Sequence, residues 1–191
     1  MSTNLPRVVM SQADIRRTIN RIAHEIVERN GGTAKLALVG VVRKGDLLAA
    51  RLSAAIRSID ENARIPVGSL DITLYRDDLG RNGFKPVVRR TEIPFDITGL
   101  TVVLVDDVVY TGRTTRAALD ALNDFGRPKA IRFAVLVDRG NRELPIQPDH
   151  VGLLVNTLPA ERVKVELKEE TGESDKVWHM EASKDWVPGE D

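Results

Sequence analysis

The segment Val102 to Leu119, VVLVDDVVYTGRTTRAAL, decides the fold because it combines three local patterns in a fixed order. It begins with residues 102–105 (VVLV), a β-branched apolar run typical of a strand buried on both faces. Two carboxylates, Asp106 and Asp107, follow that run. A stretch rich in hydroxyl groups, residues 110–115, then leads directly into a helical pattern. A buried strand, a polar turn and a helix in succession predict an α/β domain with a mostly parallel sheet.

The same segment combines a phosphate site with an acidic site. Residues 110–115 (YTGRTT), here called the phosphate loop, would present backbone N–H groups at a helix N-terminus, an arrangement that binds anions. The adjacent acids favour a ligand that carries a divalent cation as well as a phosphate. A phosphorylated sugar meets both conditions, because the acids can accept hydrogen bonds from sugar hydroxyls and balance the charge of the metal.

Length and composition narrow the class of protein. The 191 residues suffice for one ordinary α/β domain. Equal numbers of basic and acidic residues, 28 of each, exclude a globally basic nucleic-acid binder and leave only a local patch for such binding. The absence of cysteine excludes disulfides, thiol catalysis and cysteine metal sites. Since there is no apolar run of membrane-spanning length and no signal-peptide core, we expect a soluble, cytoplasmic protein.

Other segments supply the remainder of an α/β domain. Apolar residues at helical spacing predict a helix over 11–30, whose polar stripe faces away from the core. We expect further helices over 47–59 and 114–125. Strands are predicted at 36–42, 66–75 and 131–137, with weaker signals at 150–156 and at 162–169, where clean alternation is typical of an exposed antiparallel edge.

Two basic segments are candidates for binding the charged groups of a substrate. Arg43, Lys44 and Gly45 lie at a strand-to-helix turn, which predicts a second anion site. The connection over 76–98 is long for a compact domain, which favours a functional lid, and its glycines at 80 and 83 would permit motion. The lid residues suited to closing over pyrophosphate are Arg76, Arg81, Lys85, Arg89 and Arg90.

Each candidate also has a plainer structural explanation. Two acids after a strand can cap a helix, Arg43 and Lys44 can be solvated turn residues, and a basic stripe is usually the wet face of a helix. The acids and the phosphate loop at this spacing make coincidence improbable. A receiver-like signalling domain also has acids at a strand end, but the phosphate loop and the long lid argue against it. The three histidines lack metal-ligand spacing and indicate no zinc site.

The segment 102–119 resembles the phosphoribosyl-pyrophosphate (PRPP) signature of type I phosphoribosyltransferases. The segments IRRTINRIAHEIVERN, LDITLYRDDL, ALDALNDFGRP and AVLVDRGNRELPI resemble the PyrR family within that superfamily, over about residues 8–170. That family comprises bacterial attenuators of pyrimidine operons with uracil phosphoribosyltransferase activity. The resemblance implies a central, mostly parallel sheet flanked by helices, in one domain over 1–180. It further implies a small hood at about 138–160 with N-terminal residues, a flexible lid at about 76–98 and a polar tail at 181–191.

The resemblance also assigns roles to residues. Asp106 and Asp107 would be catalytic, binding the ribose hydroxyls of PRPP and, through PRPP, Mg²⁺. Arg43 and Lys44 would assist departure of pyrophosphate, at a turn where the family usually has Thr-Arg-Gly and this chain has Arg-Lys-Gly. Uracil would be held by Val137, Asp138 and Arg139. The other PRPP contacts would come from Val105, Val108, Tyr110, Thr111, Gly112, Arg113, Thr114, Thr115 and Gly45.

In the same family a basic face binds a hairpin of leader RNA, and Arg21, His24, Arg29 and Arg142 match positions of that face. Four other positions depart from the usual Thr, His, Arg and Lys. Two cationic contacts and one titratable contact are lost, so we expect RNA binding that is retained but modified. The departing residues are Asn20, Asn141, Gln147 and Leu153.

The sequence therefore predicts a homo-oligomeric enzyme that converts uracil and PRPP to UMP and pyrophosphate, and that binds leader RNA in response to UMP or UTP. Such a transfer needs no covalent nucleophile, because the protein positions two reactants, neutralises the departing pyrophosphate and excludes water. Two alternatives stay open. One is a regulator whose pocket senses nucleotide with little catalysis; the other is a phosphoribosyltransferase for another base that has lost RNA binding.

Overall fold

The computed structural model describes residues 6–77 and 90–181. Its centre is a five-stranded sheet in the order β3-β2-β4-β5-β6, in which every neighbouring pair is parallel. Parallel pairing brings the carboxyl ends of the strands to one edge, where ligands of open α/β sheets bind. The strands are β2 (Leu36–Val41), β3 (Val67–Leu70), β4 (Thr101–Val109), β5 (Ala130–Asp138) and β6 (His150–Leu154).

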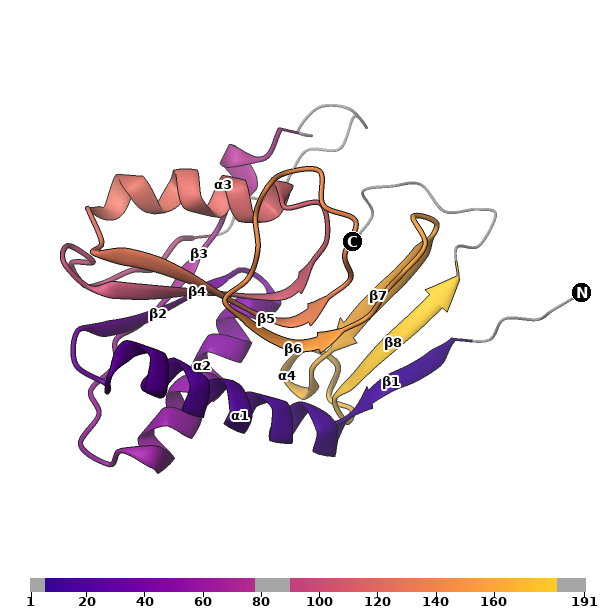
Figure 1. Cartoon of the computed structure of the whole chain (residues 1–191), viewed down its shortest axis with the longest axis horizontal. Coiled ribbons are helices and arrows are strands. Elements are labelled where there is room, and N and C mark those ends of the chain that lie inside the picture. The colour runs from indigo at the N-terminus through magenta and orange to yellow at the C-terminus, as the bar shows by residue number, and fades with distance from the viewer. Residues whose placement is uncertain (1–5, 78–89, 182–191) are drawn as a thin grey trace, which may run out of the picture.

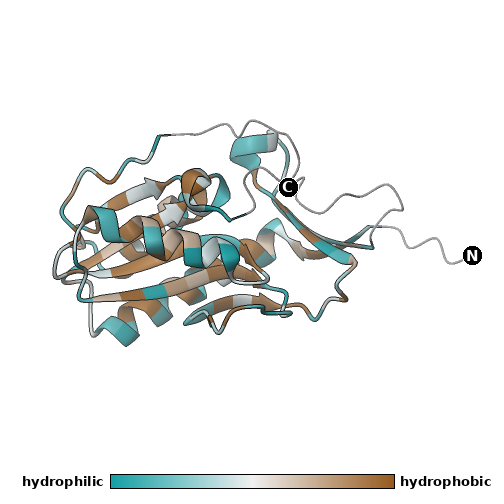
Figure 2. Cartoon of the chain, turned by 90° about the horizontal axis from the view of Figure 1, so that it is seen from above, coloured by the Kyte–Doolittle hydropathy of each residue, from teal (hydrophilic) through white to brown (hydrophobic). Residues whose placement is uncertain are grey.

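Helices cover both faces of this sheet (Figure 1). The helices α1 (Gln12–Asn30) and α2 (Lys44–Ile59) pack on one face, and α3 (Arg113–Leu122) packs on the other. Coverage on both sides is needed because the central strands are apolar on both faces. In Figure 2 the strands of the main sheet are largely hydrophobic, whereas the helices carry hydrophilic parts. The α/β class predicted from the sequence is confirmed.

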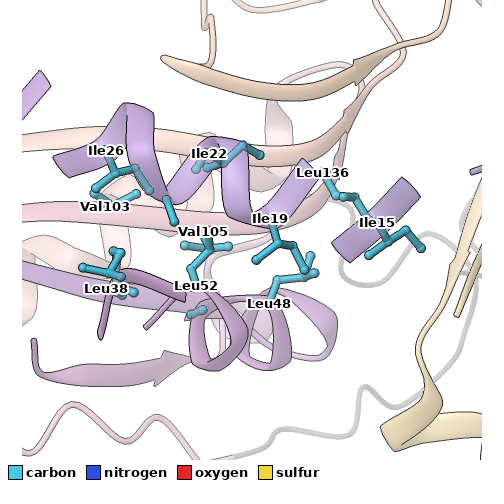
Figure 3. Packing of buried hydrophobic residues seen from close by; sticks show 14 of the residues in the cluster. Ile15, Ile19, Ile22, Ile26, Leu38, Leu48, Leu52, Val103, Val105 and Leu136 are labelled. Carbon is cyan, nitrogen blue, oxygen red and sulfur yellow. The ribbon is translucent and has the colours of Figure 1, made fainter. Parts of the chain in front are cut away.

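The first helix shows how local sequence and packing agree. Ser11 caps α1 through a capping box with Asp14, and Gly31 ends the helix with a φ of 70°. These are the start and stop signals that the sequence offers, so the helix predicted over 11–30 is confirmed. Figure 3 shows its apolar stripe directed at α2 and β4. The buried residues of that stripe are Ile15, Ile19, Ile22, Ala23 and Ile26.

A second, smaller sheet stands beside the main one (Figure 1). It is antiparallel, in the order β1-β8-β7, and consists of β1 (Arg7–Ser11), β7 (Glu161–Glu166) and β8 (Lys176–Glu181). The expected antiparallel edge strand near 162–169 is confirmed as β7. Residues 138–160, the expected hood, run from the end of β5 through β6 of the main sheet. The small sheet is therefore formed by the first strand and by segments after residue 160.

One ion cluster ties the small sheet to the main layers. Arg51 of α2 donates to Glu169 of the short helix α4 (Lys168–Thr171) at 2.5 and 2.9 Å. It also donates to the buried carboxylate of Asp175 at 2.7 and 2.9 Å, just before β8. The hydrogen bonds from Arg51 lower the pKa of Asp175. Bidentate pairs of this kind fix the orientation of both partners.

Several predicted boundaries are wrong. The strand predicted over 66–75 ends at Leu70, and a 3₁₀ turn, η1 (Thr73–Tyr75), leaves Leu74 69% exposed. The helix predicted over 47–59 begins at Lys44, and the one predicted over 114–125 ends as a 3₁₀ turn, η2 (Asn123–Phe125). The strands β1 and β8 were not predicted. Within the described ranges, none of the helices combines the length and apolarity needed to cross a membrane.

Candidate active site at the carboxyl ends of β4 and β5

The two predicted acids lie in the last part of β4. The Asp107 N–H donates to the Asp106 carboxylate at 2.9 Å, so the two acids are in direct contact. Asp106 is buried, whereas 20% of the Asp107 side chain is exposed. The Lys44 ammonium lies 3.5 Å from an Asp107 carboxylate oxygen. Burial, and then the negative charge of Asp107, raise the pKa of Asp106 well above its ordinary value.

The turn that carries Arg43 and Lys44 is seated directly on β4. A Cβ added to Gly45 would lie 2.2 Å from the carbonyl oxygen of Val105, so only glycine allows this close approach. Arg43 is exposed at the start of α2, and the peptide bond that precedes it is cis. The structure thus brings Lys44 to the acids and gives Gly45 a packing role beside the one predicted for it.

The phosphate loop has an open helix end. Gly112 is the N-cap of α3 with a φ of 91° and has no side chain to cap the helix. The Arg113 N–H donates to the Thr111 hydroxyl at 3.4 Å. The first turn of α3 contains no acidic residue, so its N–H groups and the positive end of the helix dipole are not neutralised locally. Arg113 is directed elsewhere, since its guanidinium is 2.6 Å from Asp77 and 2.7 Å from Glu143.

The residues predicted to bind uracil follow β5 and are tightly engaged. The Val137 side chain is fully buried in the core. Asp138 accepts a hydrogen bond from the Gly140 N–H at 2.9 Å and is paired with Arg142 at 2.6 Å. The Arg139 guanidinium stacks 4.0 Å above the centre of the Tyr110 ring and donates to the backbone carbonyl of Glu161 on β7.

The loop after β5, residues 138–147 and here called the β5 loop, packs against the phosphate loop. The backbone N–H groups of Glu143 and Leu144 both donate to the Thr111 carbonyl, at 2.9 and 3.1 Å. The Arg139 N–H donates to the Val109 carbonyl at 3.1 Å. Two of the segments selected from the sequence therefore form one contiguous structure. These contacts were not predicted, because backbone pairing between loops leaves no pattern in the sequence.

The residues predicted for an RNA face occupy different environments. Arg21 donates to the carbonyls of Val151 and Gly152 at 2.9 and 2.8 Å, and Arg29 donates to the Asp149 carbonyl at 2.7 Å. Both arginines are exposed and line the edge strand β6. Three further positions from that prediction differ in their surroundings. His24 is exposed, whereas only 14% of the Arg142 side chain is exposed. Asn141 adopts a φ of 56°, and its side-chain amide donates to the Thr157 carbonyl.

The predicted lid lies partly outside the described residues. This applies to Arg81, Lys85 and Arg89. Arg76 is exposed, and Arg90 is 3.8 Å from Glu92. In the described part of the chain, no three His, Asp or Glu side chains gather as a metal site would require.

Comparison with known proteins gives the family. The sequence pattern described as the phosphoribosyl transferase domain matches residues 11–170. A protein of Roseiflexus named bifunctional protein PyrR is 61% identical over 170 residues, which is 89% of this chain and 92% of that protein. One of the same name from Thermus thermophilus is 56% identical and covers 92% of this chain and 97% of its own.

The chain belongs to the PyrR family. It is therefore a phosphoribosyltransferase, as the resemblance implied. Solved structures agree on the fold: hypoxanthine phosphoribosyltransferase of Trypanosoma cruzi superposes with a TM-score of 0.69 at 20% identity, over 93% of this chain and 97% of that one. Hypoxanthine-guanine phosphoribosyltransferase of Bacillus anthracis gives 0.65 at 18% identity, over 91% and 96%. PyrR membership and the type I fold predicted from the sequence are both confirmed.

Proposed function

We propose that this PyrR protein transfers the phosphoribosyl group of PRPP to uracil at the joined carboxyl ends of β4 and β5, and that it binds pyrimidine leader RNA. The observation that carries the catalytic part is the close order of three elements. Asp106 and Asp107 lie in the last part of β4, Lys44 faces Asp107, and the first turn of α3 follows within a few residues. Each element matches one charged portion of PRPP.

Different residues at this site bind different parts of PRPP. The first-turn N–H groups of α3, at Arg113, Thr114 and Thr115, bind the 5-phosphate. Asp106 and Asp107 accept hydrogen bonds from the ribose hydroxyls. Arg43 and Lys44 stabilise the charge that develops on the departing pyrophosphate, together with basic residues of the 76–98 segment. The remaining predicted PRPP contacts at Val105, Val108, Tyr110, Thr111 and Gly112 belong to the same continuous stretch of chain.

Magnesium fits this set of donors as an ion shared with the substrate. Mg²⁺ retains several waters and takes one or two carboxylates with substrate oxygens. Asp106 and Asp107 supply carboxylates, and no third acidic or histidine ligand gathers with them in the described residues. When bound, Mg²⁺ adds positive charge against the pyrophosphate and the acids. Bound Mg²⁺ would favour the ionised form of Asp106, which burial disfavours.

Uracil binds beside the β5 loop, at Val137, Asp138 and Arg139. Its position next to the phosphate loop is supported by the backbone hydrogen bonds that join the two loops. A transfer reaction requires the base nitrogen to lie close to ribose C1 when the bond to pyrophosphate breaks. Adjacent loops after neighbouring strands satisfy that requirement.

The regulatory function uses the α1 and β6 side of the molecule. Arg21, His24 and Arg29 are exposed along α1, so their side chains are available to the backbone of a leader RNA hairpin. UMP or UTP in the nucleotide site would modulate this binding. The protein would act in the cytoplasm as a homo-oligomer, as the resemblance implies. Loss of the usual cations at Gln147 and Leu153 predicts a weaker salt dependence of RNA binding.

The catalytic part is tested by following UMP formation from uracil and PRPP with Mg²⁺. The wild-type protein should form UMP, and hypoxanthine, guanine and orotate should not replace uracil. A protein that forms no UMP but binds it would be a regulator with a sensing pocket, and one that accepts another base would be a different transferase.

The regulatory part is tested by a gel shift with the host's pyrimidine leader hairpin in the presence of UMP. The wild-type protein should shift this hairpin and not a scrambled one, and His24→Ala should weaken the shift. An equal shift of both RNAs would contradict the regulatory proposal.

A further inference from the structure

Arg142 connects four acceptors from two parts of the chain, the β5 loop and the phosphate loop. Its guanidinium donates to the Asp138 carboxylate at 2.6 Å, the Ile146 carbonyl at 2.9 Å, the Tyr110 carbonyl at 2.9 Å and the Gly140 carbonyl at 3.1 Å. Only 14% of the side chain is exposed. This guanidinium is mostly buried, and all three of its nitrogens already donate to acceptors inside the protein.

The acceptors of Arg142 lie at the points where the site is assembled. Tyr110 begins the phosphate loop, and its ring stacks with Arg139. Asp138 ends β5 and lies in the proposed base site. Gly140 and Ile146 are at the two ends of the β5 loop, so one guanidinium closes that loop on itself and attaches it to the phosphate loop.

The geometry requires an arginine. A guanidinium presents five N–H donors in a planar fork, so it can reach several acceptors at fixed angles. A lysine keeps the charge but offers a single point of attachment. In the pair with Asp138, the Arg142 side chain is 14% exposed and the Asp138 side chain is 9% exposed. Removal of either partner would therefore leave a poorly hydrated charge on the other.

We propose that Arg142 is a positioning residue for base binding: it holds Asp138 and the β5 loop against Tyr110, so that the base site is formed only when this attachment is intact. This role differs from the RNA contact predicted from the sequence. The inference rests on the proposed location of the uracil site. It identifies the residue that couples this site to the phosphate loop.

Substitution of Arg142 should affect base binding more than phosphate binding. We expect Arg142→Lys to raise the KM for uracil at least tenfold, and to change kcat at saturation and the KM for PRPP less than threefold. In calorimetry the affinity of the same variant for UMP should fall at least tenfold, and its affinity for ribose 5-phosphate should fall less than threefold. Equal losses for both ligands, or no loss, would overturn the proposal.

A double-mutant cycle with Asp138 separates positioning from general destabilisation. If Arg142 acts through Asp138, then Arg142→Lys should raise the uracil KM little further in an Asp138→Asn background. Additive effects would overturn the proposal. Arg132→Gln is the matched control, because Arg132 also lies on β5, is 56% exposed and pairs with Asp149 at 3.1 Å. This variant should leave the affinities for UMP and ribose 5-phosphate unchanged.

Two further measurements keep the result interpretable. The thermal unfolding midpoint of Arg142→Lys shows whether the variant is folded. If it is not folded, the affinities of Arg142→Gln and Asp138→Asn for UMP and for ribose 5-phosphate are measured and compared in the same way. Absence of UMP formation by the wild-type protein would contradict the proposed function. The titrations of UMP and ribose 5-phosphate would still test the positioning role of Arg142, because they do not depend on catalysis. Unchanged titrations with a lost shift of leader RNA would assign Arg142 to the RNA face and overturn the proposal.

Discussion

The carboxyl ends of β4 and β5 differ in how far the protein satisfies its own polar groups. Within the described residues, Asp106 and Asp107 at the end of β4 accept only from the next residue's N–H, at 2.9 and 2.8 Å, and Lys44 lies 3.5 Å from Asp107. The N-cap of α3, Gly112, adds no side chain there. At the end of β5, by contrast, Asp138 and Arg139 are held by the main chain and by other side chains. The first region is arranged for a charged ligand, and the second is a framework that exists before the ligand arrives.

The contrast predicts opposite consequences for substitutions. Groups that await a ligand contribute to activity and little to stability, because their interactions are made only in the complex. Groups that are bound by the protein contribute to both, because their loss leaves buried donors and acceptors without partners. The following changes test that distinction.

The largest expected effect is on activity at the end of β4. Asp107→Asn should lower kcat/KM for UMP formation at least 100-fold, because it removes charge directed at the reacting ribose and its cation. The free energy of unfolding should change by less than about 1 kcal/mol, since the contact with Lys44 is partly exposed. Steady-state kinetics and urea unfolding measure the two quantities, with Asp120→Asn on the exposed side of α3 as the control.

The end of β5 should show a loss of stability as well. Asp138→Ala removes the acceptor for Arg142 and for the Gly140 N–H, so we expect a loss of about 3 kcal/mol in the free energy of unfolding. Activity should fall with it. An unfolding free energy equal to that of the wild type would show that the β5 loop is not held as described.

Asp106 should behave in the opposite sense to Asp138. Since burial and Asp107 raise the pKa of Asp106, the folded protein retains a proton that the unfolded chain releases, and stability declines as pH rises from about 4 through the raised pKa. Asp106→Asn cannot ionise, so it should be more stable than the wild type at pH 7 and lose this pH dependence, while its activity is lost. Urea unfolding at several pH values tests this; lower stability at pH 7 would contradict it.

A smaller effect is expected on β6, away from both ends. Burial lowers the pKa of His150, despite the opposing effect of Glu25. The unfolded chain therefore binds a proton first as pH falls below about 6.5, and stability should decline between that pH and the lower pKa of the folded state. His150→Asn should remove this decline in the free energy of unfolding, which we expect to be about 1 kcal/mol or less. Thermal unfolding at pH 7.5 and 5.5 measures it.

The sequence predicted the β4 end better than the β5 end for a physical reason. Strand, acids, loop and helix lie within eighteen consecutive residues, and each has a local signal. The β5 end depends on partners far along the chain: Arg139 meets Tyr110 and Glu161, and Arg142 meets Tyr110. No spacing rule reports such contacts, so Arg142 was assigned from family resemblance to a surface role.

The same argument accounts for the errors in the fold. The pattern that suggested a strand to residue 75 continues past Leu70, but pairing with β2 stops at Leu70, and on its other edge β3 makes, in the part of the chain that the structure describes, only an isolated bridge from Ser69 to Glu92. The strands β1 and β8 are short and mixed in polarity, and they form because they pair with each other across about 170 residues of sequence. Pairing partners at that distance cannot be read from local alternation.

The central claim is that residues 106–115 bind a phosphorylated ribose that carries magnesium. Calorimetric titration of PRPP, with and without Mg²⁺, into the wild-type protein and an Asp106→Asn, Asp107→Asn double variant tests it most directly. We predict tight binding to the wild type that depends on Mg²⁺ and is at least 100-fold weaker in the double variant. Equal affinity in both proteins, or binding to the wild type that is indifferent to Mg²⁺, would contradict the claim.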